Sequence, residues 1–163
     1  VPDISLPSII SIDEVGENQK DNALEWDTIA RVPYYQKSGN TIDDTLDELR
    51  ELSFDRRNSD PNMMSLINKI ALSRDLSAEK TLSLNLDLRK ARSESWDEQV
   101  FVIENSRRTA LNLEPFNTID EWQAYLEDSE GEAESESPIS ETDPILFESA
   151  RILADQIFLS RNN

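Results

Sequence analysis

Apolar residues recur at helical spacing along most of this chain, and five stretches show the pattern. Residues three and four positions apart lie on the same face of a helix, so each stretch predicts a helix with one buried stripe. The expected helices span about residues 41–53, 61–72, 86–111, 119–126 and 144–159. We therefore expect a mainly α fold, a small helical bundle.

Short polar residues stand in front of these stretches and support their starts. The candidate N-caps are Thr41, Ser59 or Asp60, Asn85, Thr118, and Thr142 or Asp143. Their side-chain oxygens can accept hydrogen bonds from the free N–H groups of a first turn. Pro61 and Pro144 follow two of these caps, at the position where proline is favoured. Glu121 completes a capping box with Thr118.

One stretch departs from helical spacing. Its leucines alternate with polar residues: Leu82, Leu84, Leu86 and Leu88. This is the period of a half-buried strand, although Asn85 could equally cap a long helix that begins at Leu86. We favour a short strand followed by the helix. Isoleucines at positions 9, 10 and 12 favour a second short strand, so the fold has at most one or two.

Composition divides the chain into four regions. Residues 1–40 hold three prolines, which oppose helix, and read as an extended lead-in. Residues 41–126 form the helical domain. Residues 127–142 are mostly Glu, Ser and Asp and bury too little apolar area to offset their ordering entropy, which predicts an acidic flexible linker. Residues 143–163 form a C-terminal amphipathic helix.

The last helix carries an apolar face that predicts a docking surface. Leu146, Ala150, Leu153 and Ile157 fall on one side at helical spacing. A helix of this kind at the end of a flexible linker docks on its own chain or lies in a groove of another chain. These four residues are the candidate docking face.

The charge excludes some partners. The chain has 34 acidic and 16 basic side chains and a net charge of −18, with eight acids and no base between Glu127 and Asp143. Nucleic acid and anionic membrane surfaces both require clusters of basic residues, so neither is an expected partner. The pairs Arg56–Arg57 and Arg107–Arg108 read as ion-pair partners of nearby acids. No apolar run reaches the roughly 20 residues of a membrane span, so no membrane insertion is expected.

The absence of His and Cys removes most catalytic chemistry from this chain. Imidazole bases, thiolate nucleophiles and typical zinc sites all need one of the two. A Ser–Lys pair remains, but all five lysines lie in polar or amphipathic settings that do not lower an amine pKa. The acidic stretch 128–136 lacks the ligand order of a calcium loop. We expect no catalytic residue, no metal site and no cofactor.

Short strings along the chain resemble those of one known family, the tail-specific (carboxyl-terminal processing) serine proteases. They are Pro2-Asp3-Ile4-Ser5-Leu6-Pro7-Ser8, Asp21-Asn22-Ala23-Leu24-Glu25-Trp26-Asp27, Tyr35 with Lys37-Ser38-Gly39, Leu82-Ser83-Leu84-Asn85, Glu104-Asn105-Ser106-Arg107-Arg108, and Asp143-Pro144-Ile145-Leu146-Phe147-Glu148 with Ile152 and Asp155. Each string is weak alone. Their common order across the chain is specific.

The resemblance implies that this chain is the non-catalytic C-terminal region of such a protease. The parent is then a periplasmic endopeptidase that degrades proteins with apolar C-terminal tails, using a PDZ domain and a Ser–Lys dyad. Both catalytic residues belong to a core that precedes this region, so no position here takes those roles. The implied partners are the parent's own protease core and PDZ domain and, through them, its protein substrates. The implied role is to support the core and shape substrate access.

Three other functions compete with this one. The chain could be an adaptor-binding or self-associating module, with the face at residues 146, 150, 153 and 157 buried against a second protein or a second copy. It could be a free-standing acidic decoy that mimics nucleic acid, which its charge favours. It could also be an autonomous hydrolase, which requires turnover by this chain alone.

Overall fold

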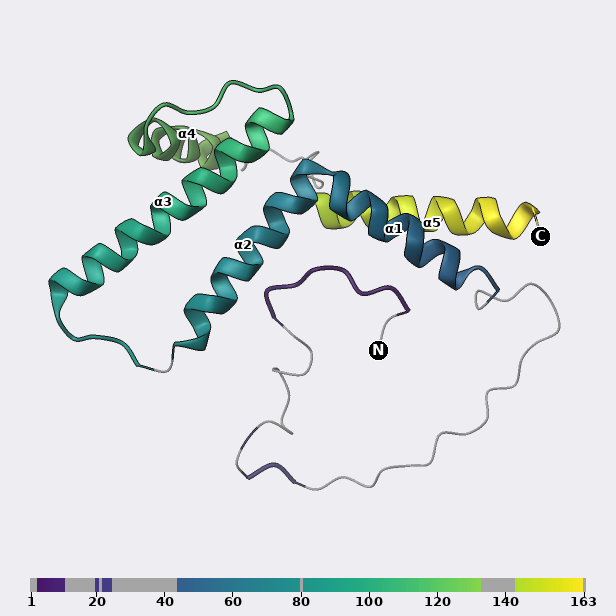
Figure 1. Ribbon diagram of the computed structural model, residues 1–163, viewed down its shortest axis with the longest axis horizontal. Coiled ribbons are helices and arrows are strands. Elements are labelled where there is room, and N and C mark those ends of the chain that lie inside the picture. The colour runs from purple at the N-terminus through teal and green to yellow at the C-terminus, as the bar shows by residue number, and fades with distance from the viewer. Residues whose placement is uncertain are drawn as a thin grey trace.

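The chain forms separate helices joined by short connections. A computed structural model describes residues 3–10, 20, 22–24, 44–79, 81–132 and 143–162, and in these the fold is all α, with no strand (Figure 1). The helices are α1 (Leu46–Ser59), α2 (Pro61–Ala78), α3 (Leu86–Ala110), α4 (Ile119–Glu132) and α5 (Pro144–Asn162). The predicted mainly α class is confirmed.

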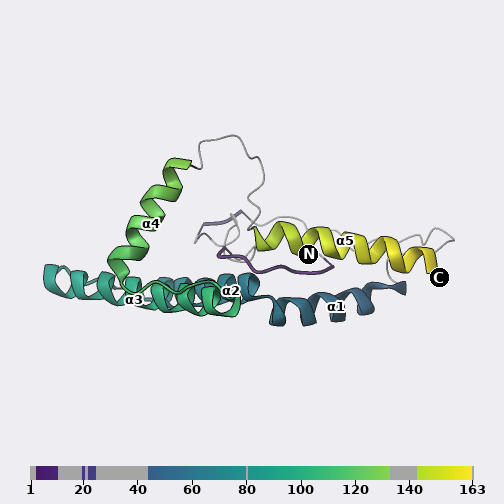
Figure 2. The same cartoon turned by 90° about the horizontal axis from the view of Figure 1, so that it is seen from above.

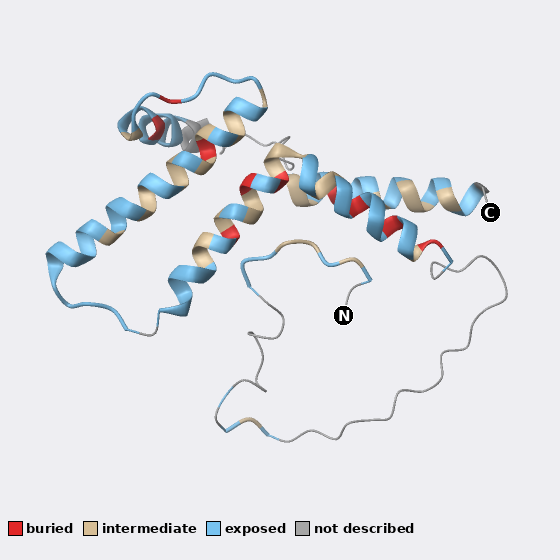
Figure 3. Cartoon of the chain, in the orientation of Figure 1, coloured by how far each residue is buried: buried red, intermediate tan, exposed pale blue. Residues whose placement is uncertain are grey.

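The helices pack in pairs. α2 and α3 lie side by side as an antiparallel hairpin, α5 lies along α1, and α4 contacts α3 near the end of that helix (Figures 1 and 2). Buried apolar side chains mark these contacts instead of filling one thick core (Figure 3). They are Leu49, Met63, Ile70, Phe116 and Trp122. The predicted stripe of the second helix therefore supplies two of the five.

Four helices begin where the capping residues predict. At α4, Thr118 Oγ1 accepts a hydrogen bond from Glu121 N–H at 3.2 Å. Asp60 accepts hydrogen bonds from the N–H groups of Asn62 and Met63 and starts α2. Asn85 Oδ1 accepts from the second and third residues of α3. Asp143 Oδ1 accepts from Ile145 and Leu146 at the start of α5, at 2.9 and 3.1 Å. Each cap satisfies N–H groups that have no partner inside the helix.

The predicted strand at the leucine alternation is wrong. Residues 81–85 lie outside any helix, strand or turn, and Asn85 caps a helix that takes in Leu86 and Leu88. Period two indicates one-sided burial, yet in the described residues there is no sheet that these leucines could join. Ile9 and Ile10 lie in a bend, so the second predicted strand is wrong there also. Ile12 lies outside the described residues.

Several boundaries differ from those expected. α1 begins at Leu46 after Thr45 and runs to Ser59, and the expected cap Thr41 lies outside the described residues. α2 continues to Ala78. α4 continues to Glu132, so the first six residues of the expected acidic linker are helical, and residues 133–142 lie outside the described part. Acidic residues are compatible with the exposed side of a helix as well as with a flexible linker. Composition alone therefore did not distinguish the two.

Residues 3–10 of the lead-in are held on α1 and α2 through their main chain. Three guanidiniums donate to its carbonyl oxygens: Arg50 Nε to Asp3 at 3.2 Å, Arg57 Nη1 to Ser5 at 2.9 Å, and Arg74 Nη2 to Ser8 at 3.0 Å. This short segment therefore follows the two helices without forming regular structure of its own.

Candidate functional site between α1 and α5

The contact between α1 and α5 brings together residues that lie about a hundred positions apart. Glu148 on α5 is buried against α1, and Thr45, Leu49 and Ser53 on α1 are buried as well (Figure 3). On α5, Ile152 and Asp155 are half-buried. They lie four and seven positions after Glu148, which places them on the same helix face. The face of α5 that meets α1 is therefore centred on a carboxylate.

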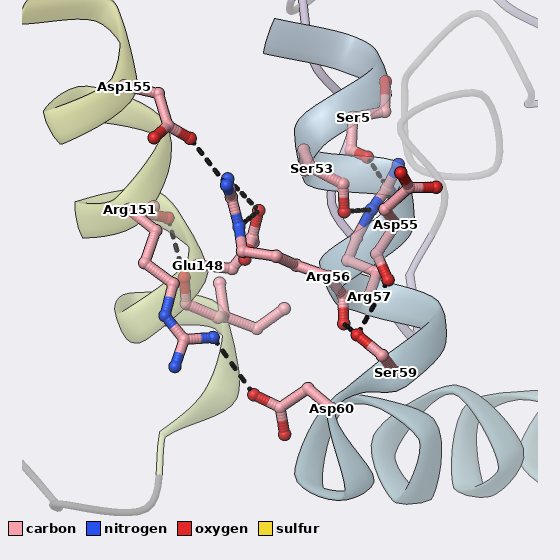
Figure 4. Close-up of polar contacts among 12 residues, drawn as sticks. Ser5, Ser53, Asp55, Arg56, Arg57, Ser59, Asp60, Glu148, Arg151 and Asp155 are labelled. Atoms are coloured by element: carbon pink, nitrogen blue, oxygen red, sulfur yellow. Dashed lines mark hydrogen bonds and ion pairs between the residues drawn. The ribbon is translucent and has the colours of Figure 1, made fainter. Parts of the chain in front are cut away.

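Arg56 of α1 binds two carboxylates of α5 (Figure 4). Its Nε and Nη2 donate to Glu148 Oε1 at 3.2 and 2.9 Å, and Nε also donates to Glu148 Oε2 at 3.1 Å. Nη1 donates to Asp155 Oδ2 at 2.6 Å. The hydrogen bonds to Glu148 raise the pKa of Arg56 above its ordinary value, outweighing the opposing effect of burial, and Asp155 raises it further. The guanidinium is thus a fixed positive charge between two helices.

Two further bonds fix α5 along its length. Arg151 Nη1 donates to Asp60 Oδ2 at 3.2 Å, while the other oxygen of Asp60 caps α2 (Figure 4). Thr45 Oγ1 donates to Gln156 Oε1 at 2.9 Å near the start of α1. Asp60 therefore ties three helices together, because its N–H donates to the Arg56 carbonyl oxygen at the end of α1 while its carboxylate caps α2 and holds α5.

Ser53 lies at the centre of this contact and is fully buried. Its hydroxyl oxygen has no hydrogen-bond partner within the described part of the chain. An activated serine needs a general base within hydrogen-bonding reach, so Ser53 has the environment of a packing residue.

The predicted docking face of α5 points away from α1. Leu146 is 41 % exposed, Leu153 62 % and Ile157 46 %, and Ala150 is exposed too. These positions lie roughly 150° around the helix from the centre of the face that carries Glu148. α5 therefore has a polar face packed within the chain and an apolar face open to solvent. Docking of the apolar face stays a prediction.

A second polar cluster lies between α2 and α3. Glu104 is buried and accepts hydrogen bonds from Lys69 at 3.2 Å and from Arg107, which also donates to Asn62 Oδ1 at 2.9 Å. Burial would raise the pKa of Glu104, but the hydrogen bond from Arg107 and the charge of Lys69 outweigh it and hold this pKa below its ordinary value. Trp122 of α4 closes one side of an adjoining hollow of about 370 Å³.

The string Glu104–Arg108 also fixes the α3–α4 connection to α3. Asn105 donates to the carbonyl oxygen of Phe116 at 2.9 Å and accepts from its N–H at 2.8 Å. Arg108 lies over the Phe116 ring, 4.1 Å from its centroid, and donates to the Glu114 carbonyl oxygen. Four of the five residues in this string thus hold the fold together.

The sequence predicted the type of these contacts better than the partners. Ion pairing is confirmed for Arg56 and for Arg107, whereas in the described residues Arg57 and Arg108 bind carbonyl oxygens instead of acids. Sequence reasoning missed the central role of Glu148. The available signal was a spacing: Glu148 lies four and seven positions before Ile152 and Asp155, so the three share one helix face. This spacing does not reveal a partner on α1.

The described residues offer no metal site and no membrane span. No group of three or more Asp and Glu side chains among them is placed to hold a metal ion. None of their helices is both long and apolar enough to cross a bilayer.

Comparisons with known proteins identify the family to which the chain belongs. Residues 10–157 match the family described as the C-terminal domain of tail specific protease. The chain is 35 % identical over 96 residues to the tail-specific protease of Haemophilus influenzae, a match that covers 58 % of this chain and 14 % of that relative. No solved structure matches it. The match over most of its length shows that this chain belongs to the family of C-terminal domains of tail-specific proteases.

Proposed function

We propose that this chain is the non-catalytic C-terminal part of a periplasmic serine endopeptidase that degrades proteins with apolar C-terminal tails. In this proposal it supports the protease core and shapes the access of substrates. The Ser–Lys dyad and the PDZ domain belong to the rest of the polypeptide. Family membership supports the proposal, and so does a chain without His or Cys in which the buried Ser53 hydroxyl has no hydrogen-bond partner among the described residues.

The contrast between the packed face and the exposed face of α5 is the observation that carries the supporting role. Arg56 fixes one face of the helix to α1 through Glu148 and Asp155. The opposite face exposes Leu146, Leu153 and Ile157 to solvent. A helix anchored in this way presents its apolar side in a fixed orientation, as a surface for a larger body requires.

The test uses the full-length protease with charges placed on that face. Leu153→Asp and Ile157→Asp leave the α1 contact intact, because both side chains point to solvent. We expect the double variant to cut a protein with an apolar C-terminal tail at least about tenfold more slowly, since charges at a buried apolar contact are costly. The rate of tail-dependent cleavage is the measurement.

Phe158→Asp is the matched control. Phe158 is at least as exposed as Leu153 but is rotated by roughly 140° from Leu153 around the helix axis. We expect its cleavage rate to equal that of the wild type. Unchanged cleavage in the Leu153 and Ile157 double variant, with α5 still in place, refutes the supporting role.

The same exposed face favours a second candidate, an adaptor-binding or self-associating module. Three large apolar residues on one face match the anchors of a helix that lies in a groove of another protein. Sedimentation of the full-length protein decides between the two. Concentration-dependent association that Leu153→Asp abolishes favours self-association, and a monomer at all concentrations removes it.

A further inference from the structure

The connection between α2 and α3 has an apolar tip that nothing in the described chain covers. In the loop, Leu82 is 57 % exposed and Leu84 94 %, and at the start of α3 Leu86 is 62 % and Leu88 61 % exposed. Figure 3 shows this end of the hairpin as exposed. Exposed leucines gathered at one end of a hairpin are typical of an interaction site.

The backbone of the tip is also unpaired. Residues 81–84 make no backbone hydrogen bond to any other described residue, and Ser83 contributes only its side-chain oxygen, which accepts from Asn85 N–H at 3.2 Å. Leu82 and Leu84 are two positions apart, so in an extended chain their side chains point to the same face. Free peptide groups with one apolar face are what a strand needs in order to join the edge of a sheet.

The charge around the tip indicates the chemistry of its partner. Residues 74–92 carry five basic and three acidic side chains, a net charge of +2 in a chain of −18. Arg92 pairs with Glu79 at 2.7 Å and closes the hairpin behind the tip. Arg89 and Lys90 are exposed and form no ion pair with the described residues. The complementary surface is therefore apolar with an acidic rim, which a second copy of this basic tip is not.

A protein partner fits the tip better than a lipid surface does. Unpaired N–H and C=O groups are costly in hydrocarbon, and residues 81–84 would carry several of them into the bilayer. The net charge of −18 also opposes approach to anionic lipid. Docking on a sheet edge avoids the cost of unpaired N–H and C=O groups, because the neighbouring strand forms hydrogen bonds with them.

We propose that residues 81–84 join, as an added edge strand, an acid-rimmed β-sheet in the protease portion of the same polypeptide. The inference rests on the proposed function, since the family is a C-terminal domain and the matched segment is 14 % of the relative's length. Leu82 and Leu84 pack on one face of that sheet. Arg89 and Lys90 meet its acidic side chains.

The experiment is hydrogen–deuterium exchange of the full-length protein, read at single-residue resolution by mass spectrometry. In an edge strand alternate N–H groups point toward the partner, so every second amide among residues 81–84 is protected. We expect those amides to exchange at least about tenfold more slowly in the wild type than in Leu84→Asp, which loses no contact within this domain. Exchange of all four at the rate of an unstructured peptide overturns the proposal.

Val102→Asp is the control, because Val102 is similarly exposed but lies in the middle of α3. We expect it to leave the protection unchanged. Binding of the wild type to phosphatidylglycerol vesicles that Leu84→Asp abolishes would assign the tip to membrane and overturn the proposal. Protection that appears only at high protein concentration would assign it to a second copy, with the same consequence.

Exchange is read without substrate, so the two proposals fail separately. Protected amides in a protein that does not cut apolar-tailed substrates would remove the proposed function and leave the docking. Active protease with unprotected amides would remove the docking alone.

Discussion

The α1–α5 contact and the α3–α4 contact join helices by different chemistry. Between α1 and α5, Arg56 meets Glu148 and Asp155 from the far end of the sequence. Between α3 and α4 the partners are close in sequence and aromatic, with Phe101 and Trp122 ring centroids 6.1 Å apart. Ion pairs fix a direction and an orientation, whereas aromatic burial supplies energy with less demand on geometry.

The difference follows from what each helix has to do. α4 closes a hollow beside α2 and α3 and is reached by a short connection, so apolar contact is enough to hold it. In the proposed function α5 presents one apolar face outward, and apolar residues on its other face as well would leave its rotation ambiguous. A charge network that fits one rotation removes that ambiguity.

Removing Trp122 should lower the stability most, because it removes the aromatic contact between α3 and α4. Trp122→Ala deletes a buried ring and leaves part of its volume empty, which we expect to lower the free energy of unfolding by about 3–4 kcal/mol. Urea denaturation of the full-length protein measures it, with the exposed neighbour Gln123→Ala as control. A loss below about 1 kcal/mol would show that the neighbouring helices close the space.

Removing Arg56 should lower the stability by a smaller amount, because it removes the charged contact between α1 and α5. Arg56→Ala leaves Glu148 buried without its cation, which we expect to cost about 2–3 kcal/mol and to release α5. Amide exchange along α5 is the measurement. Arg50→Ala on the same helix removes an exposed pair with Asp47 and an exposed hydrogen bond to the Asp3 carbonyl oxygen, neither of which involves α5, so it should leave the exchange of α5 unchanged. Equal exchange of α5 in both variants would mean that apolar contacts hold it.

Lowering the pH should have the smallest effect on stability, and it acts through the Glu104 carboxylate. Its pKa is lowered from the ordinary 4.5, so the unfolded chain takes up the proton more readily than the folded one. The stability from this group is complete above pH 4.5 and falls as pH drops through the folded-state pKa. We therefore expect Glu104→Gln to be less stable than wild type at pH 7 and the difference to narrow below pH 4.5. Stability curves measured from pH 7 to pH 3 check this, and a constant difference contradicts it.

Local signals in the sequence predicted the helices well, because their causes are local. Asp60 before Pro61 and Asp143 before Pro144 fix helix starts through bonds that span two or three residues. Asn85 did the same for α3, where the leucine alternation favoured a strand. Alternation indicates that one side is buried, but nothing in the described residues buries these leucines.

The long-range contacts could not be predicted in this way. Nothing near Arg56 in the sequence points to Glu148, 92 positions away, because the pairing depends on how α5 packs. The docking face shows the same limit. Periodicity grouped Leu146, Leu153 and Ile157 on one side, but α5 meets its own chain through a face whose centre is charged.

The contacts of Arg50, Arg57 and Arg74 with the lead-in have a consequence for how this segment tolerates change. The three cations bind peptide oxygens, a group that every residue type has. Side chains at positions 3, 5 and 8 can therefore vary without loss of these bonds. One residue inserted between positions 5 and 8 would move a carbonyl out of reach, so this surface selects for chain spacing and not for composition.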